Sequence, residues 1–139
     1  MALAHALVAA ELETVLGESV GLSINEFDVL AGLDAAPGKS LPLSDLDGLV
    51  RLSQPAISRM VARLMDRELV TRSGSPNDRR RYSLHLTKTG AELLVRAVPI
   101  HSACIQRRLL ARLSPNERDV LRDALLKIID TAAPAPNTL

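Results

Sequence analysis

The chain contains a single cysteine, Cys104, among its 139 residues. One thiol excludes an intrachain disulfide and a zinc site built from several thiolates. No apolar run approaches the roughly 20 residues that cross a bilayer, and no basic segment precedes an apolar stretch at the N-terminus, as it does in a secretory signal. We therefore expect a protein of the reducing cytoplasm without a membrane partner.

Aromatic residues are nearly absent as well, because Phe27 and Tyr82 are the only ones. The core must then be built from Leu, Val, Ile and Ala, which favours helices. The scarcity of rings also argues against binding of single-stranded nucleic acid, since such sites stack bases on several exposed aromatic side chains.

Motifs of enzymes and metal sites are missing too. The sequence shows no glycine-rich phosphate loop, no nucleophile elbow and no paired carboxylates beside a candidate base. The three histidines, His5, His85 and His101, lack the spacing of metal ligands. We therefore predict no catalytic residue, no metal site and no cofactor.

The charge is unevenly distributed, although it sums to only +1. Residues 1–50 carry eight acidic residues against one lysine, whereas residues 51–81 carry eight arginines against three acidic residues. Such a concentration of arginine in a nearly neutral chain predicts a basic surface that faces one direction. The alternative is an ordinary solvated face, and the elements that carry the arginines decide between the two.

Apolar residues in the first part of the chain recur at helical spacing. They predict a helix over about residues 3–17 and a second helix that begins at the capping box of Ser23 and Glu26. A loop with two prolines and a glycine follows at residues 37–42. A short helix is expected next, with four side chains facing inward: Leu43, Leu46, Leu49 and Val50.

Ser53 is a good N-cap, and Pro55 suits the first turn of a helix that runs to about Glu68. The apolar stripe of this helix consists of Ile57, Met60, Val61 and Leu64. Periodicity then changes to alternation, which predicts strands over residues 69–73 and 82–86 joined by a hairpin tip rich in turn formers and arginine.

The remaining sequence predicts two more helices. Thr87 caps a long one, which Pro99 kinks without ending it because the apolar pattern resumes beyond the proline. Ser114 and Glu117 form another capping box, with Pro115 at the first helical position. The last helix carries a further set of aliphatic residues: Val120, Leu121, Leu125, Ile128 and Ile129.

A short helix, a tight turn, a longer helix and a hairpin form a winged helix-turn-helix. The predicted fold class is therefore mainly α with a small β-hairpin wing. We expect one domain over residues 1–139. Its DNA-binding region covers about residues 23–88, and its helical dimerisation region covers about residues 1–18 and 88–132.

The winged helix has the side chains needed to read double-stranded DNA. Its recognition helix buries one face and can place the other in a major groove, where glutamine and arginine suit contacts to base edges. The residues expected on the DNA side are Gln54, Pro55, Ser58 and Arg59, with Arg63 on the flank and Ser53 at the cap.

The hairpin tip supplies a second anchor, because an arginine there can enter a narrow minor groove. We predict Arg80 for this role, with Arg79 beside it and the Asp78 carboxylate holding a guanidinium extended. The alternative is that Asp78 merely closes the turn while the arginines point into water.

Several of these motifs together resemble the MarR family of bacterial transcriptional regulators: Leu52–Val61, Arg63-Leu64, Leu69-Val70, Asp78–Arg80, Leu86-Thr87 and Gly90. The resemblance is specific from about Leu43 to Leu94. It implies a homodimer clasped by terminal helices, one winged helix on each side, and repression of neighbouring genes. It assigns DNA contacts, by motif position, to Ser53, Gln54, Ser58, Arg59, Arg63 and Arg80. One departure is Asp47, where the family usually has a small apolar residue.

The resemblance also implies a response to a small phenolic or other aromatic effector, or to oxidants through cysteine. His101 is the candidate effector contact, because it follows Pro99 near the place of the family's pocket. Cys104 lies on a mainly apolar helical stretch, so a buried inert thiol is favoured over a peroxide sensor.

Dimerisation is also expected from the residues themselves. One winged helix has a small footprint, whereas a two-fold dimer reads half-sites about one turn (~34 Å) apart. The sequence therefore predicts a homodimeric repressor that binds a double-stranded operator and responds to a ligand. The alternative is a winged helix that binds another protein, but arginines on both the recognition helix and the wing favour DNA.

Overall fold

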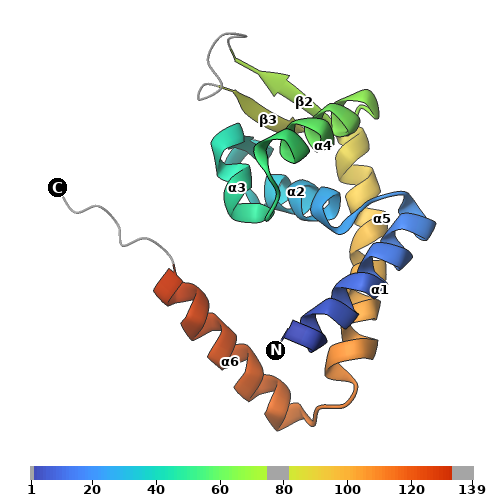
Figure 1. Cartoon of the computed structure of the whole chain (residues 1–139), viewed down its shortest axis with the longest axis vertical. Helices are drawn as coiled ribbons and strands as arrows, with labels where there is room; N and C mark the ends of the chain where they lie inside the picture. Colours follow the sequence, from blue (N-terminus) through green and yellow to red (C-terminus); the bar gives the residue numbers. More distant parts are fainter. Residues whose placement is uncertain (1, 75–81, 133–139) are drawn as a thin grey trace, which may run out of the picture. The chain divides into compact units, whose positions relative to one another are not determined.

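The computed structural model describes residues 2–74 and 82–132. The chain forms two compact units, Met1–Cys104 and Ile105–Leu139. The first contains most of the elements shown in Figure 1: α1 (Ala2–Val20), α2 (Ile24–Ala35), η1 (Pro37–Lys39), β1 (Ser40–Pro42), η2 (Leu43–Asp45), α3 (Leu46–Leu49), α4 (Gln54–Asp66), β2 (Val70–Ser73), β3 (Ser83–Leu86) and α5 (Lys88–Ile105). The second contains the π-helical turn η4 (Gln106–Leu110) and α6 (Pro115–Ala132). The predicted fold class is confirmed.

The wing sheet has one strand more than the predicted hairpin. Its antiparallel strands lie in the order β1-β3-β2, with Leu41 of β1 opposite Leu84 of β3 and Val70 of β2 opposite Leu86. Residues 37–42, expected as a loop, thus include a strand. A three-residue edge strand that ends in proline shows no periodicity, and its only strand partner comes from a distant part of the chain.

Helix α1 continues to Val20 instead of ending near Gly17. Gly17 stays helical, and the chain leaves the helix at Gly21, whose φ of +65° is one that glycine adopts without strain. The capping box at the start of α2 is confirmed. The Ser23 hydroxyl accepts the Glu26 N–H at 3.2 Å, and the Glu26 carboxylate accepts the Ser23 N–H at 2.9 Å.

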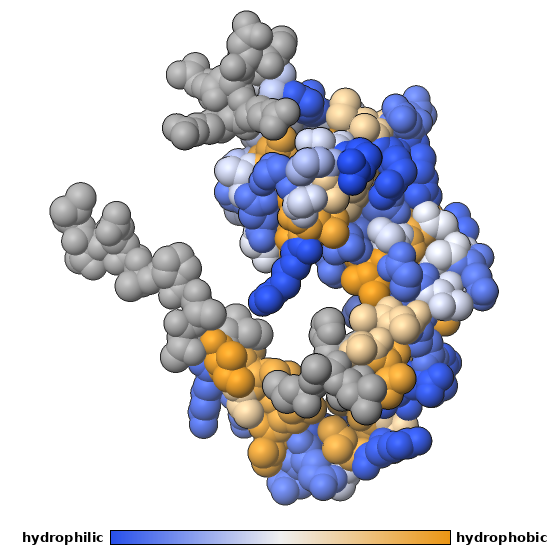
Figure 2. Space-filling model, viewed as in Figure 1, coloured by the Kyte–Doolittle hydropathy of each residue, from blue (hydrophilic) through white to orange (hydrophobic). Residues whose placement is uncertain are grey.

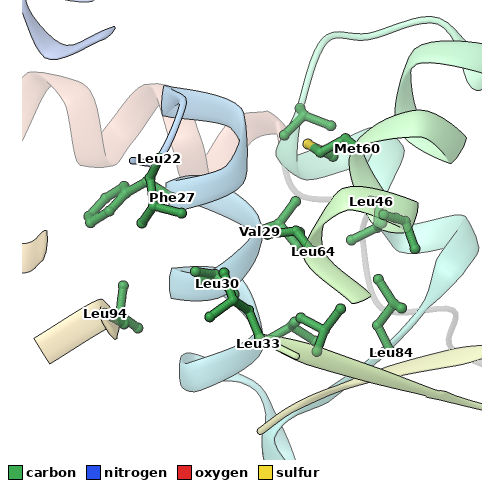
Figure 3. Packing of buried hydrophobic residues seen from close by; sticks show 14 of the residues in the cluster. Leu22, Phe27, Val29, Leu30, Leu33, Leu46, Met60, Leu64, Leu84 and Leu94 are labelled. Atoms are coloured by element: carbon green, nitrogen blue, oxygen red, sulfur yellow. The ribbon is translucent and has the colours of Figure 1, made fainter. Parts of the chain in front are cut away.

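The core of the first unit is aliphatic, as composition predicted. Helix α2 contributes Val29, Leu30 and Leu33 to a buried cluster. Side chains from α3, α4, β3 and α5 pack into the same cluster (Figure 3). The predicted stripe of α4 is confirmed as buried: Ile57, Met60, Val61 and Leu64. The inward orientation expected for Leu49 is wrong, since its side chain is 37% exposed. Leu49 ends a one-turn helix at the rim of the core, against the bare backbone of Gly32.

Thr87 joins the sheet to the start of α5. Its hydroxyl oxygen accepts the Gly90 N–H at 2.9 Å, and the hydroxyl lies 2.7 Å from the Glu68 carbonyl and 3.0 Å from the Leu69 carbonyl. A Cβ on Gly90 would collide with the same Leu69 carbonyl. The cap is therefore confirmed, and α5 continues through Pro99 as predicted.

The second unit begins α6 with the predicted capping box. The Ser114 N–H donates to the Glu117 carboxylate at 2.8 Å, and the Ser114 hydroxyl lies 3.4 Å from the Glu117 N–H. Four large apolar residues of α6 are exposed: Val120, Leu125, Leu126 and Ile128. Figure 2 shows hydrophobic surface over this helix. Among the described residues, no helix has both the length and the hydropathy needed to cross a membrane.

Candidate nucleic-acid interface

Helix α4 presents the predicted DNA-facing residues on its open side. Gln54, Pro55, Ser58 and Arg59 are all exposed, opposite the buried stripe. The Arg59 side chain is exposed and makes no hydrogen bond or ion pair with another residue that the structure describes. A guanidinium carries five N–H donors for an external acceptor.

Ser53 precedes α4 in the extended conformation of an N-cap, and its carbonyl accepts the Ile57 N–H at 2.9 Å. Ser53 is thus the N-cap, as predicted, although its side chain makes no capping hydrogen bond. Pro55 in the first turn has no N–H, which reduces the number of donors that a cap must satisfy. The Ser53 hydroxyl is exposed at the end of the helix whose amide groups attract anions.

Gln54, the first residue of α4, forms hydrogen bonds with Asp47 of α3. Its amide nitrogen lies 2.8 Å from one carboxylate oxygen of Asp47 and 3.0 Å from the other. Sequence reasoning singled out Asp47 as a departure from the family pattern but did not connect it with Gln54. The seven-residue separation across a turn gives no periodic signal for such a contact.

Arg63 is tied to the N-terminus of α2. Its Nε donates to Glu26 at 3.3 Å, and Arg67 lies 3.9 Å from the other oxygen of the same carboxylate while donating to the Gly21 carbonyl at 2.7 Å. Glu26 is only 5% exposed, so its charge is neutralised by the two arginines and by its capping hydrogen bond. The Arg63 side chain remains 61% exposed, which leaves its terminal nitrogens accessible.

The base of the wing is ordered by side-chain contacts. The Arg72 guanidinium lies 3.3 Å from the centre of the Tyr82 ring, and Ser73 and His85 share a 2.6 Å hydrogen bond across β2 and β3. Tyr82 is buried, and its carbonyl accepts the Leu43 N–H. The predicted tip contacts, Asp78, Arg79 and Arg80, lie outside the described residues, so their roles stay predictions.

A shallow groove of about 420 Å³ separates α4 from the wing strand β2. Ser58, Ala62 and Asp66 of α4 line it together with Arg72 of β2. The groove thus carries charges of both signs, Asp66 on α4 and Arg72 on β2.

His101 lies apart from this surface, on α5. Its ring stacks on Phe27 of α2. Burial raises the pKa of the neighbouring Asp28 carboxyl, and electrostatic attraction to His101 offsets part of that rise. Cys104, three residues on, is 1% exposed, which confirms the buried thiol. Among the residues described, no group of three histidine, cysteine or acidic side chains could hold a metal ion.

The fold and its exposed helix define a winged helix-turn-helix protein, and comparison with known proteins agrees. The MarR family model matches residues 22–82. A Thauera aromatica protein that carries the name of a transcriptional regulator for the hcr operon is 32% identical over 91% of this chain and 74% of its own length. Other curated relatives match over only 57% of their length.

Solved structures show the same fold. Sco3205 of Streptomyces coelicolor, a MarR family regulator crystallised with DNA, is 24% identical with a TM-score of 0.79, over 98% of this chain and 86% of its own. BpsR of Bordetella bronchiseptica is 27% identical with a TM-score of 0.73, and the match covers 91% of this chain and 88% of BpsR. The chain belongs to the MarR family of winged-helix transcriptional regulators, a family of regulators and not of enzymes.

Proposed function

We propose that this protein is a homodimeric repressor that binds a specific double-stranded operator. Helix α4 enters the major groove, and the wing reaches the adjacent minor groove through Arg80. The observation that carries the proposal is the open face of α4, where Gln54, Ser58 and Arg59 are exposed above a fully buried stripe. Action on a bacterial chromosome places the protein in the cytoplasm.

Each DNA contact follows from the chemistry of its side chain. Arg59 reads a guanine edge or a phosphate, and Gln54 reads a base edge. Ser53 and Ser58 contact phosphates, while the terminal nitrogens of Arg63 reach the backbone as Glu26 holds its Nε. Pro55 contributes shape, and Asp78 and Arg79 support Arg80 at the wing tip.

Dimerisation accounts for the apolar surface of the terminal helices. Leu125 and Ile128 of α6 are 44% and 60% exposed in the single chain, and Leu7 of α1 is 62% exposed. Apolar surface of this kind is typical of a protein–protein interface. A second copy that buries it would form the helical dimerisation region and set the separation of the two recognition helices.

A small aromatic effector regulates binding in this proposal. Among the similar proteins, BpsR of Bordetella bronchiseptica is one whose DNA binding is regulated by 6-hydroxynicotinic acid. In the present chain, His101 provides an aromatic surface and a donor at the junction of α2 and α5. A ligand that prefers a dimer whose half-site spacing does not fit DNA lowers operator affinity by that preference.

Selection of bound fragments from the protein's own genomic DNA tests the proposal. We expect a two-fold symmetric site, bound more tightly than bulk competitor and with a steep salt dependence. Arg59→Ala should weaken binding by about 1–3 kcal/mol, and Arg80→Ala should reduce the salt slope by about 0.9 for each phosphate that the variant no longer neutralises. Arg96→Ala, which removes an exposed arginine of α5, is the matched control.

Unchanged DNA affinity in both Arg59→Ala and Arg80→Ala, or the absence of any preferred fragment, would contradict the proposal. Those results would favour a winged helix that binds another protein. A single-chain mass in light scattering at micromolar concentration would contradict the dimer.

A further inference from the structure

The first residue of the recognition helix is bonded to the preceding helix through its side chain. The two carboxylate oxygens of Asp47, on α3, lie 2.8 and 3.0 Å from the amide nitrogen of Gln54, on α4. Both side chains are exposed, so the contact contributes little to the core. It does constrain the direction in which Gln54 points.

The chemistry of the pair determines which end of the Gln54 amide faces outward. An ionised carboxylate only accepts hydrogen bonds, so the NH₂ group must face Asp47. The amide oxygen, Oε1, is then directed away and has no partner among the residues that the structure describes. Gln54 therefore presents a hydrogen-bond acceptor at the leading end of the helix.

An acceptor in the major groove selects for a donor. The base edges that offer one there are the N6 amine of adenine and the N4 amine of cytosine, whereas guanine and thymine present acceptors. An unrestrained glutamine can rotate its amide and so form a hydrogen bond with either a donor or an acceptor on a base edge. The contact from Asp47 removes that freedom.

The negative charge of Asp47 also lowers the affinity of the protein for DNA. It lies on the helix before the recognition helix, where approach to phosphates is repulsive. That repulsion is the same for every sequence, so it lowers affinity without changing preference. The difference between right and wrong sequences comes from the orientation of Gln54 alone.

We propose that Asp47 is a specificity-determining positioning residue: it holds Gln54 so that its amide oxygen reads adenine or cytosine in the major groove, while its charge lowers affinity for DNA of every sequence. This inference rests on the proposed function of α4 as a recognition helix.

The test compares selected sequences and affinities for the wild type, Asp47→Ala and Asp47→Asn. For Asp47→Ala we expect the preference at one base pair of each half-site to fall about fivefold or more, the lower end of what a base contact supplies, while affinity for unrelated DNA rises. Asp47→Asn offers the Gln54 amide a donor as well as an acceptor, so either end of the amide can face it. The preference should therefore fall in Asp47→Asn too, by less than in Asp47→Ala. A defect in folding would lower both quantities instead.

Asp45→Ala is the matched control, because Asp45 is an exposed acid two residues earlier whose described side-chain hydrogen bond is to Ser44. It should raise affinity for unrelated DNA without altering any base preference. In a Gln54→Ala background, Asp47→Ala should leave the base preference unchanged, since the residue that it orients is gone.

The outcomes separate the two proposals. A wild-type protein that enriches no sequence overturns the proposed function and this inference with it. A wild type that enriches a clear site, with Asp47→Ala retaining the same preference at every base pair, overturns the role of Asp47 alone.

Discussion

The imidazole of His101 lies nearly parallel to the ring of Phe27, with the ring centroids 4.5 Å apart and 12° between the planes. The stack connects α5 with the N-terminal half of α2, the helix that also anchors Arg63 through Glu26. It is thus the aromatic link between the long helix and the helix-turn-helix.

Loss of this stack should lower the stability of the folded protein. We expect His101→Ala to lower the free energy of unfolding in urea by about 0.5–1.5 kcal/mol beyond the effect of lost area, the usual contribution of an aromatic pair. His101→Phe keeps a ring at the position and serves as the control. Equal stability of the Ala and Phe variants would show that the contact contributes nothing.

Asp28 should make stability depend on pH. Burial raises its pKa from 3.8, although attraction to His101 offsets part of the shift. The folded state then holds the proton more tightly than the unfolded state, so the stability contribution of this group falls as pH rises from 3.8 through the raised folded pKa. We expect Asp28→Asn to be more stable than the wild type at pH 7, with the difference shrinking in acid.

The pKa of Glu117 is shifted in the opposite direction from that of Asp28, so its effect on stability has the opposite pH dependence. Hydrogen bonds from the backbone and side chain of Ser114 lower its pKa below 4.5. Its contribution is present above the unfolded pKa and is lost as pH falls through the lowered folded value. Glu117→Gln should therefore be less stable than the wild type at neutral pH. Parallel pH profiles for the Asp28 and Glu117 variants would contradict both assignments.

Gly90 is required for the approach of α5 to the sheet. A Cβ there would meet the Leu69 carbonyl, so Gly90→Ala should lower the free energy of unfolding by about 1–3 kcal/mol or more. Gly17→Ala is the matched control, since nothing lies within 4 Å of the added carbon and the residue is helical. That substitution should stabilise by up to about 1 kcal/mol. Thermal melts of the two variants should shift in opposite directions.

Glu26 joins a helix cap to the recognition helix. Glu26→Ala removes the capping bond to the Ser23 N–H and leaves Arg63 without its partner, so we expect a loss of about 1–2 kcal/mol in unfolding free energy. Glu26→Gln keeps an oxygen for the cap but loses the charge, and its loss should be smaller. Equal losses in both variants would show that only the charge matters.

The exposed face of α6 should control assembly. Ile128→Glu places a charge on the apolar surface that the proposed dimer buries. We expect a single-chain mass in light scattering and a melting temperature that no longer depends on protein concentration. Arg122→Glu on the same helix, where Arg122 pairs with Asp119 and Asp123, tests whether any new acid disrupts the dimer.

Patterns that repeat along the chain predicted much of this fold. The stripe of α4 and the capping boxes at Ser23 and Ser114 depend on neighbours three or four residues away, so sequence reasoning found them. The strand β1 was missed because its pairing with β3 is set by residues more than 40 positions later. Leu49 was misplaced because helical periodicity does not show how little of a one-turn helix reaches the core.

In the candidate site, too, some features could be predicted from the sequence and others could not. Residue type and position on α4 were enough to select Gln54, Ser58 and Arg59 as an exposed set. The restraints on that set were not predictable, because the partner of Arg63 lies 37 residues away and that of Gln54 lies across a turn. Such contacts carry no sequence period, and they become visible only when the helices are packed.

The hydroxyl of Thr87 lies at the meeting point of the sheet and α5, next to a glycine that allows no gap between them. The Thr87 N–H also donates to the Leu69 carbonyl, at 3.2 Å. The start of α5 is therefore bonded directly to the residue before β2, and β2 in turn adjoins α4. In the proposed dimer, each winged helix would then move as one unit when the spacing of the two recognition helices changes.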